Sequence, residues 1–159
     1  HEYYPAGRPI VDRMAGEGRV HVVLNSAERV ARRGALYIAG VDYPFARGEA
    51  FYAEKTAYFA AAMADVPVDA VTVLLAHHPE FIDDAAAYGG IPLTLTGHTH
   101  GSQFGILGQP LFPVFKYTRG MVHIGDSYGY VHTGNGSWFP LRIGCPPEVA
   151  YFRLERTAQ

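Results

Sequence analysis

Apolar and polar positions follow one another in blocks along the chain, and the blocks predict regular elements. Apolar residues recur every three to four positions in three segments, which predicts amphipathic helices over 8–18, 48–64 and 79–89. Short runs rich in Val, Leu and Ile, with breaking residues on both sides, predict strands over 20–25, 35–41, 70–76 and 92–96. The first two-thirds of the chain therefore alternate helix with strand.

The last third of the chain has a different pattern. After Gly105 the sequence is dominated by Gly, Pro and aromatic residues. Residues 120–134 predict a hairpin that turns at Gly125 and Asp126, and 149–155 predict a closing strand. This order of elements favours an α/β domain that ends in antiparallel strands.

Composition narrows the class of protein. A length of 159 residues predicts a single domain, 1–159, and 48% apolar against 18% charged residues excludes a disordered chain. The net charge of −2 and the absence of a large basic cluster argue against nucleic acid as a partner. No run is apolar enough to span a membrane, and we expect a cytoplasmic protein. Aromatic residues make up 13% of the chain. They form either an aromatic core or an exposed surface that binds a second copy or a substrate.

Histidines follow two of the predicted strands at the point where each strand ends. His77 and His78 come after 70–76, and His98 and His100 come after 92–96. Sites in α/β folds favour the carboxyl ends of strands, and imidazole is a good ligand for zinc, iron or manganese. We interpret His78 as structural, since Pro79 follows it. The other three histidines are the predicted metal ligands.

Several segments resemble the calcineurin-like metallophosphoesterases, and especially their bacterial branch. The clearest are LLAHHPEF at 74–81 and LTLTGHTHGSQ at 93–103. HEYYPAG at 1–7 resembles the tail of that family's GNHE motif, ALYIAGVD at 35–42 its LYLAGVDD segment, and 134–154 its closing segment. Together these segments follow the family's order over nearly the whole chain.

The resemblance implies a fold and a function. The fold is an α/β/β/α sandwich, and the function is hydrolysis of a phosphodiester or phosphomonoester by water activated at one or two divalent ions of Zn, Mn or Fe. It implies that His77 and His98 bind one metal, that His100 binds the other, and that His1 is the catalytic acid. Asn135 and Trp138 are implied at the substrate rim.

The carboxylate motifs of that family precede GNHE and have no match in this sequence, which predicts a domain truncated at its N-terminus. Asp42, after the 35–41 strand, is the best substitute ligand within the chain. Three alternatives follow: an enzyme with a reduced metal site, a non-catalytic fragment stabilised as a homo-oligomer, and a half-enzyme that needs a complementing N-terminal segment. We expect the remaining acidic residues and histidines to be structural or to face solvent, namely Asp83, Asp84, Asp126, His21, His123 and His132.

Overall fold

The structure is a computed structural model that describes residues 8–18, 20–30 and 34–155. Three α-helices and one short 3-10 helix lie in this part of the chain: α2 (Arg8–Gly16), α3 (Glu49–Met63), α4 (Phe81–Tyr88) and η1 (His100–Ser102). The strands are β1 (Ser26–Arg29), β2 (Leu36–Val41), β3 (Val71–Ala76), β4 (Leu93–Thr96), β5 (Gly105–Ile106), β6 (Gln109–Pro110), β7 (Gly120–Ile124) and β8 (Ser127–Val131).

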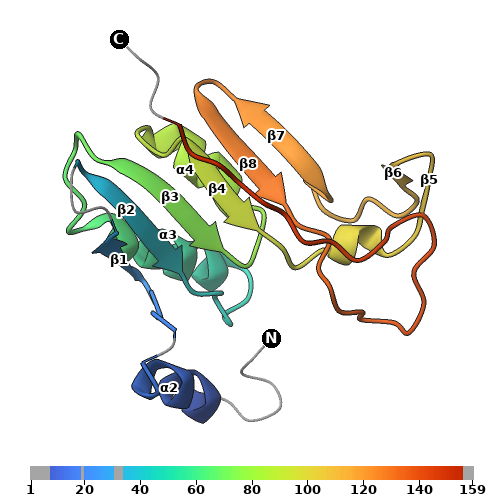
Figure 1. The fold of residues 1–159 in the computed structure, drawn as a ribbon, viewed down its shortest axis with the longest axis horizontal. Helices are drawn as coiled ribbons and strands as arrows, with labels where there is room; N and C mark the ends of the chain where they lie inside the picture. Colours follow the sequence, from blue (N-terminus) through green and yellow to red (C-terminus); the bar gives the residue numbers. More distant parts are fainter. Residues whose placement is uncertain (1–7, 19, 31–33, 156–159) are drawn as a thin grey trace.

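Six of these strands form one sheet in the order β1-β2-β3-β4-β8-β7 (Figure 1). The four inner strands, β2, β3, β4 and β8, are parallel, and β1 and β7 pair antiparallel at the two edges. The carboxyl ends of the four inner strands therefore lie along one edge of the sheet. The prediction of an α/β fold that ends in an antiparallel hairpin is confirmed.

The main core lies between this sheet and the helices α3 and α4, which cover one of its faces (Figure 1). Ala39 on β2 and Leu74 on β3 pair in register and are fully buried beneath α3 and α4. Gly129 on β8 lets α4 approach closely, because a Cβ at this position would lie 2.5 Å from Ile82. Periodicity in the sequence therefore identifies the buried faces of these elements correctly.

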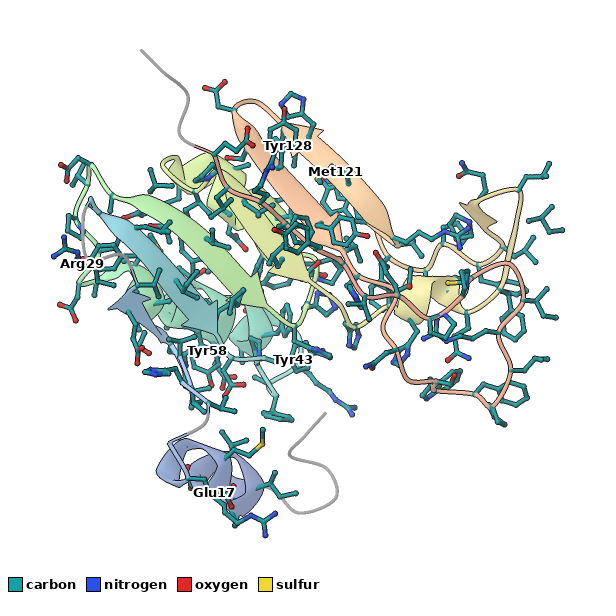
Figure 2. The ribbon with its side chains drawn as sticks, viewed as in Figure 1. Glu17, Arg29, Tyr43, Tyr58, Met121 and Tyr128 are labelled. Carbon is teal, nitrogen blue, oxygen red and sulfur yellow. The ribbon has the colours of Figure 1, made fainter. Side chains whose placement is uncertain are left out.

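The opposite face of the sheet is apolar and partly exposed. Val71 and Leu75 of β3, Met121 of β7 and Tyr128 of β8 are exposed there, and Figure 2 shows the last two side chains on their hairpin. Residues 149–155 cross this face, where Phe152 packs on Tyr130 with the ring centroids 5.1 Å apart. The described residues thus contain one helix layer and one six-stranded sheet layer of the predicted sandwich.

Two predicted strands are wrong. Residues 20–25 form no ladder, because Asn25 adopts a left-handed φ of 49° and the chain joins β2 only after it, as β1. The Asn25 side chain instead accepts a hydrogen bond from the Asp42 N–H at 2.8 Å. Residues 149–155 form no strand either, since they cross the sheet face instead of extending an edge.

Asp83 and Asp84 are partly exposed, as expected, and both are also paired with lysines. Asp83 accepts hydrogen bonds from Lys116 at 2.9 Å, and Asp84 forms an ion pair with Lys55 at 2.6 Å. Both carboxylates are half-buried on α4. In the part of the chain described, no helix is both long and apolar enough to cross a membrane.

Candidate metal centre

Two histidines meet at the carboxyl edge of the sheet. β3 ends at Ala76 and β4 ends at Thr96, so His77 and His98 leave neighbouring parallel strands at the same level. The N–H of Gly97 donates to the His77 carbonyl at 3.1 Å and ties the two strand ends together. Nδ1 of His98 then lies 3.0 Å from Nε2 of His77. Because β3 and β4 are neighbours, the histidines that follow them converge at one edge of the sheet.

Aromatic side chains pack around this pair. The ring of Tyr43, which follows β2, stacks on His98 with centroids 5.9 Å apart, and Figure 2 shows Tyr43 beside the strand ends. Phe115 packs edge-on against His98, with the ring centroids 5.1 Å apart. His78 is 6% exposed and packs 4.7 Å from His98, as its predicted structural role requires. The imidazole of His98 is therefore held among rings.

This packing keeps His78 and His98 uncharged at neutral pH. Burial, together with the charges of His78 and His100, lowers the pKa of His98 to about 4. Burial and the charge of Lys55 lower the pKa of His78 to about 4 as well. A metal binds the neutral form of imidazole, so these shifts keep His98 competent as a ligand well below pH 7.

The turn after β4 carries a concentration of backbone strain. His98, His100, Ser102 and Gln103 all have positive φ, between 51° and 71°. A non-glycine residue in this region costs of order 1–3 kcal/mol, and such residues cluster at functional sites. Gly101 lies in the same turn with φ 62°, and a Cβ there would lie 2.6 Å from Cys145 Sγ. The turn is thus held in an unfavourable conformation by the structure around it.

His100 lies half-buried on this turn. Its Nδ1 atom is buried and has no hydrogen-bond partner within the described ranges. Burial and the charge of Arg142 lower the pKa of His100, against a backbone hydrogen bond to Gly136 that tends to raise it. The loop that carries Asn135 passes beside this ring, and Asn135 itself is exposed. An orphaned buried imidazole nitrogen is the kind of atom that a metal ion would satisfy.

The His77–His98 pair fits a metal in its spacing. Two nitrogen ligands at about 2.0–2.1 Å from a tetrahedral ion lie about 3.3 Å from each other. The observed 3.0 Å separation is close to this value, so a small opening of the pair would admit an ion. Among the described residues, however, no group of three or more His, Cys, Asp or Glu side chains is arranged to hold a metal. The described residues therefore bring together two potential ligands, fewer than a metal site usually needs.

The other predicted site residues lie as follows. Asp42 ends β2 in register with the strand end of β3, where its Oδ1 accepts from the Tyr43 N–H at 2.8 Å. His1 lies outside the described residues. The remaining three histidines have structural contacts, as predicted: with Glu28 for His21, with Tyr128 for His123 and with the Gly134 N–H for His132.

A pocket of about 490 Å³ opens beside the site. Sequence reasoning identified only three of the residues that line it, and missed most of its wall. The dense aromatic composition after Gly105 was the one signal for this wall. The lining residues are His98, Thr99, His100, Ser102, Gln103, Phe104, Phe112, Val114, Phe115, Thr118 and Trp138.

Gln103, one of these lining residues, was not predicted from the sequence. It is buried, and its side-chain oxygen accepts from the N–H groups of Trp138 at 2.6 Å and Phe139 at 3.0 Å. Its amide nitrogen donates to the carbonyls of Phe139 and Leu141 at 2.8 and 2.9 Å. Gln103 thus fastens the loop that carries Trp138 to the strained turn that carries His98 and His100.

Curated relatives of the chain are named metallophosphoesterases or, in one case, a phosphodiesterase. An uncharacterized metallophosphoesterase of Helicobacter pylori (strain J99) is 31% identical over 156 residues, which are 97% of this chain and 40% of that protein. Phosphodiesterase YaeI of Escherichia coli is 36% identical over 52% of this chain and 32% of its own length. YkuE of Bacillus subtilis, also named an uncharacterized metallophosphoesterase, is 35% identical over 54% of this chain and 32% of its own length.

Two further comparisons complete this picture. No family model matches the sequence. A solved structure of the sulfate thiohydrolase SoxB from Thermus thermophilus is similar with a TM-score of 0.42 and 22% identity, over 79% of this chain and 25% of that chain. The chain spans at most about 40% of the length of the curated relatives that it matches.

Proposed function

Because the chain belongs to the metallophosphoesterase family, as its curated relatives show, we propose that it acts in the metal-dependent hydrolysis of phosphodiesters or phosphomonoesters. The observation that carries this proposal is the contact between His77 and His98, 3.0 Å apart at the ends of two neighbouring strands. The strained turn that bears His98 and His100 supports it, since strain of this kind persists where function requires the geometry.

We assign the ligands in two groups. His77 and His98 hold one divalent ion, and His100, through its orphaned buried nitrogen, ligates a second ion or the same one. A bound divalent ion of Zn, Mn or Fe supplies a Lewis acid that lowers the pKa of water and polarises the phosphoryl oxygens. Asp42, at the neighbouring strand end, is the nearest carboxylate on the described strand ends that can join the site.

The other residues of the site position groups and exclude water. Tyr43 stacks on His98 and Phe115 packs edge-on against it, so that both restrict its ring. Trp138 and Asn135 form the substrate rim in this proposal, and Trp138 lines the pocket beside His98. His1 is the proposed acid that protonates the leaving oxygen.

One observation favours an assembly larger than the described chain. The sheet face opposite α3 and α4 is apolar and exposed at Val71, Leu75, Met121 and Tyr128. The described residues also lack a third ligand beside the histidine pair. We propose that a further protein segment, from the family's carboxylate-bearing part or from a second copy, covers this face and completes the ligand set.

A phosphodiesterase assay tests the proposal. We expect hydrolysis of bis-p-nitrophenyl phosphate that depends on added Mn²⁺ or Zn²⁺. The rate should fall more than about 100-fold in His98→Ala, because loss of a residue that only hydrogen-bonds to a metal ligand already costs about 10- to 100-fold. His123→Ala, on the exposed hairpin, is the matched control and should keep full activity. Equal activity in His98→Ala and the parent protein would overturn the assignment.

The same assay separates the enzyme from the half-enzyme. Activity that appears only after the remaining part of a full-length relative is added would support a complementing segment. Metal uptake should be measured in parallel by elemental analysis. Neither metal nor turnover, with or without the added segment, would favour the non-catalytic fragment.

A further inference from the structure

The pocket beside the candidate metal centre is lined by apolar and uncharged polar side chains together with two histidines. Five of its lining residues are large and apolar: Phe104, Phe112, Val114, Phe115 and Trp138. None of the described lining residues is Lys, Arg, Asp or Glu. A ligand that carries a second phosphate or another charged group would find no ionic partner in these walls. The volume of about 490 Å³ lies within the range of small-molecule sites.

Apart from the two histidines, the polar side chains in the pocket wall form hydrogen bonds within the protein. The Thr99 hydroxyl donates to the Thr118 carbonyl at 2.6 Å, and the Thr118 hydroxyl donates to the Phe115 carbonyl at 3.2 Å. The Ser102 hydroxyl accepts from the Phe112 N–H at 3.2 Å. Both ends of the Gln103 amide bind the 138–141 loop. The wall therefore presents mainly apolar surface to a ligand, and a sugar or base would leave its polar groups unpaired.

The mouth of the pocket continues this apolar character onto the surface. Trp138 is 87% exposed and Val114 81% exposed, and Phe112 is exposed between them in the lining. Exposed apolar surface of this kind around a pocket marks a binding site. Leu107, Leu111 and Phe139 extend it on the same irregular part of the chain.

The pocket and the candidate metal centre share two residues. His98 and His100 belong to both, so a ligand in the pocket lies against the imidazoles of the candidate metal centre. A phosphate at the metal centre thus places one of its ester groups at the pocket entrance. Shared residues of this kind make the pocket a determinant of substrate choice.

From this arrangement we infer that the pocket binds a large apolar alkyl or aryl group of the phosphoester substrate, so that the enzyme acts on amphiphilic phosphoesters. The inference rests on the proposed phosphoesterase function for the reaction, but the binding of the apolar group does not need turnover. In the reaction, water adds to phosphorus and the P–O bond to the leaving alcohol breaks. The alcohol leaves with a proton, and the apolar group stays on the phosphate or departs with the alcohol.

Tryptophan fluorescence tests binding without turnover. Trp138 is the one tryptophan in the 159 residues, so its emission reports on the pocket directly. We expect n-octyl phosphate, below its micelle concentration, to give a saturable shift of the emission to shorter wavelength, and methyl phosphate to give none at the same concentration. Phe112→Ala should weaken octyl phosphate binding at least tenfold, and Tyr128→Ala, an exposed aromatic on the far hairpin, should not change it.

Two results would overturn the inference. One is the absence of a saturable response to octyl phosphate, as expected if a second copy of the chain or another segment already fills the pocket. The other is an equal response in Phe112→Ala and the parent protein. Trp138→Phe must abolish the signal, which confirms its origin.

Hydrolysis of a matched pair of substrates then separates the inference from the function on which it rests. Octyl and methyl p-nitrophenyl phosphate share one leaving group, so only the apolar group differs. We expect kcat/KM for the octyl ester to exceed that for the methyl ester at least tenfold, and Phe112→Ala to reduce this ratio. Octyl phosphate binding without hydrolysis of either ester would refute the proposed function alone. Hydrolysis of both esters at equal rates, without binding, would refute the inference alone.

Discussion

The strands β2, β3 and β4 with their helices are built differently from the segment 97–145, which adds β7 and β8 to the sheet and is otherwise irregular. Strands β2, β3 and β4 with helices α3 and α4 are held by buried apolar side chains such as Leu74, and their backbone is regular. The 97–145 segment has short strands, many left-handed residues and side chains that bind backbone groups, above all Gln103 and Arg142. Yet the candidate metal centre and the pocket draw most of their residues from this second region.

The two regions therefore contribute to the candidate site in different ways. The sheet places His77 and the start of the His98 turn at one edge, which apolar packing alone can do. The irregular region holds the turn in a strained conformation and builds the pocket wall, which requires individual hydrogen bonds. We therefore expect the sheet to respond to mutation as one cooperative unit and the irregular region to respond locally.

The largest effect on stability should come from the sheet. Leu74→Ala removes a side chain with 0% exposure at the centre of the core and should destabilise the protein by about 3 kcal/mol. Urea unfolding followed by circular dichroism measures this loss. Leu74→Met, which roughly conserves volume, is the control and should lose less than about 1.5 kcal/mol. Equal losses in the two variants would show that packing at this position does not hold the sheet.

A smaller and local effect should come from Gln103. Gln103→Ala leaves the N–H groups of Trp138 and Phe139 without their acceptor, at a cost of about 2 kcal/mol that falls on the loop. Hydrogen exchange at these two amides should accelerate, while core amides in β3 stay protected. Gln103→Glu keeps an acceptor oxygen but places a second oxygen against the Phe139 and Leu141 carbonyls, so it should not restore the slow exchange. A uniform acceleration across the sheet would break the distinction between the two regions.

The free energy of unfolding should depend on pH through the protonation of the buried imidazoles, which lie where the two regions meet. Burial holds the pKa of His78 and His98 at about 4 in the folded protein, against an ordinary value of 6.5. Below pH 6.5 the unfolded chain binds protons that the folded chain does not, so stability should fall as pH decreases from 6.5 to 4 and then level off with respect to these groups.

Urea midpoints of the metal-free protein at pH 7, 5.5 and 4 measure this decline. His78→Phe removes one of the two groups and should make the decline shallower. Midpoints that stay constant from pH 7 to pH 4 in the parent protein would contradict the burial of these rings.

The smallest effect should come from the surface pair that joins the irregular region to α4. Burial tends to raise the pKa of Asp83, but hydrogen bonds from Lys116 and Tyr117 outweigh it and lower this pKa. Lys116→Ala should therefore raise the Asp83 pKa toward its ordinary value and leave the unfolding midpoint nearly unchanged. Titration of the carboxyl carbon by NMR measures the pKa, and Lys116→Arg should largely preserve it.

The two regions also differ in how well the sequence predicted them. Periodicity located α3, β3, α4 and β4 within about two residues, because each element buries one face against the others. It failed at 20–25, where the left-handed Asn25 ends an apolar run before any pairing begins. It failed again at 149–155. The alternating pattern there predicts a strand, but the segment crosses the face of the sheet.

At the site, the sequence identified the histidines but not what holds them. His77 and His98 follow visible strand signals, so their meeting at one edge was predictable from the parallel order. Tyr43, Phe115 and Gln103 act through contacts between segments far apart in the chain, and no local pattern indicates such contacts. The pocket depends on these contacts, so its chemistry became visible only in the structure.

The most direct test of the central claim is a calorimetric titration of the metal-free protein with Zn²⁺ and with Mn²⁺. If His77 and His98 hold a divalent ion, the parent protein and His123→Ala bind at least one ion per chain with equal affinity, and His98→Ala loses this binding. Binding of the same ion by His98→Ala, with the affinity and stoichiometry of the parent protein, would contradict the account.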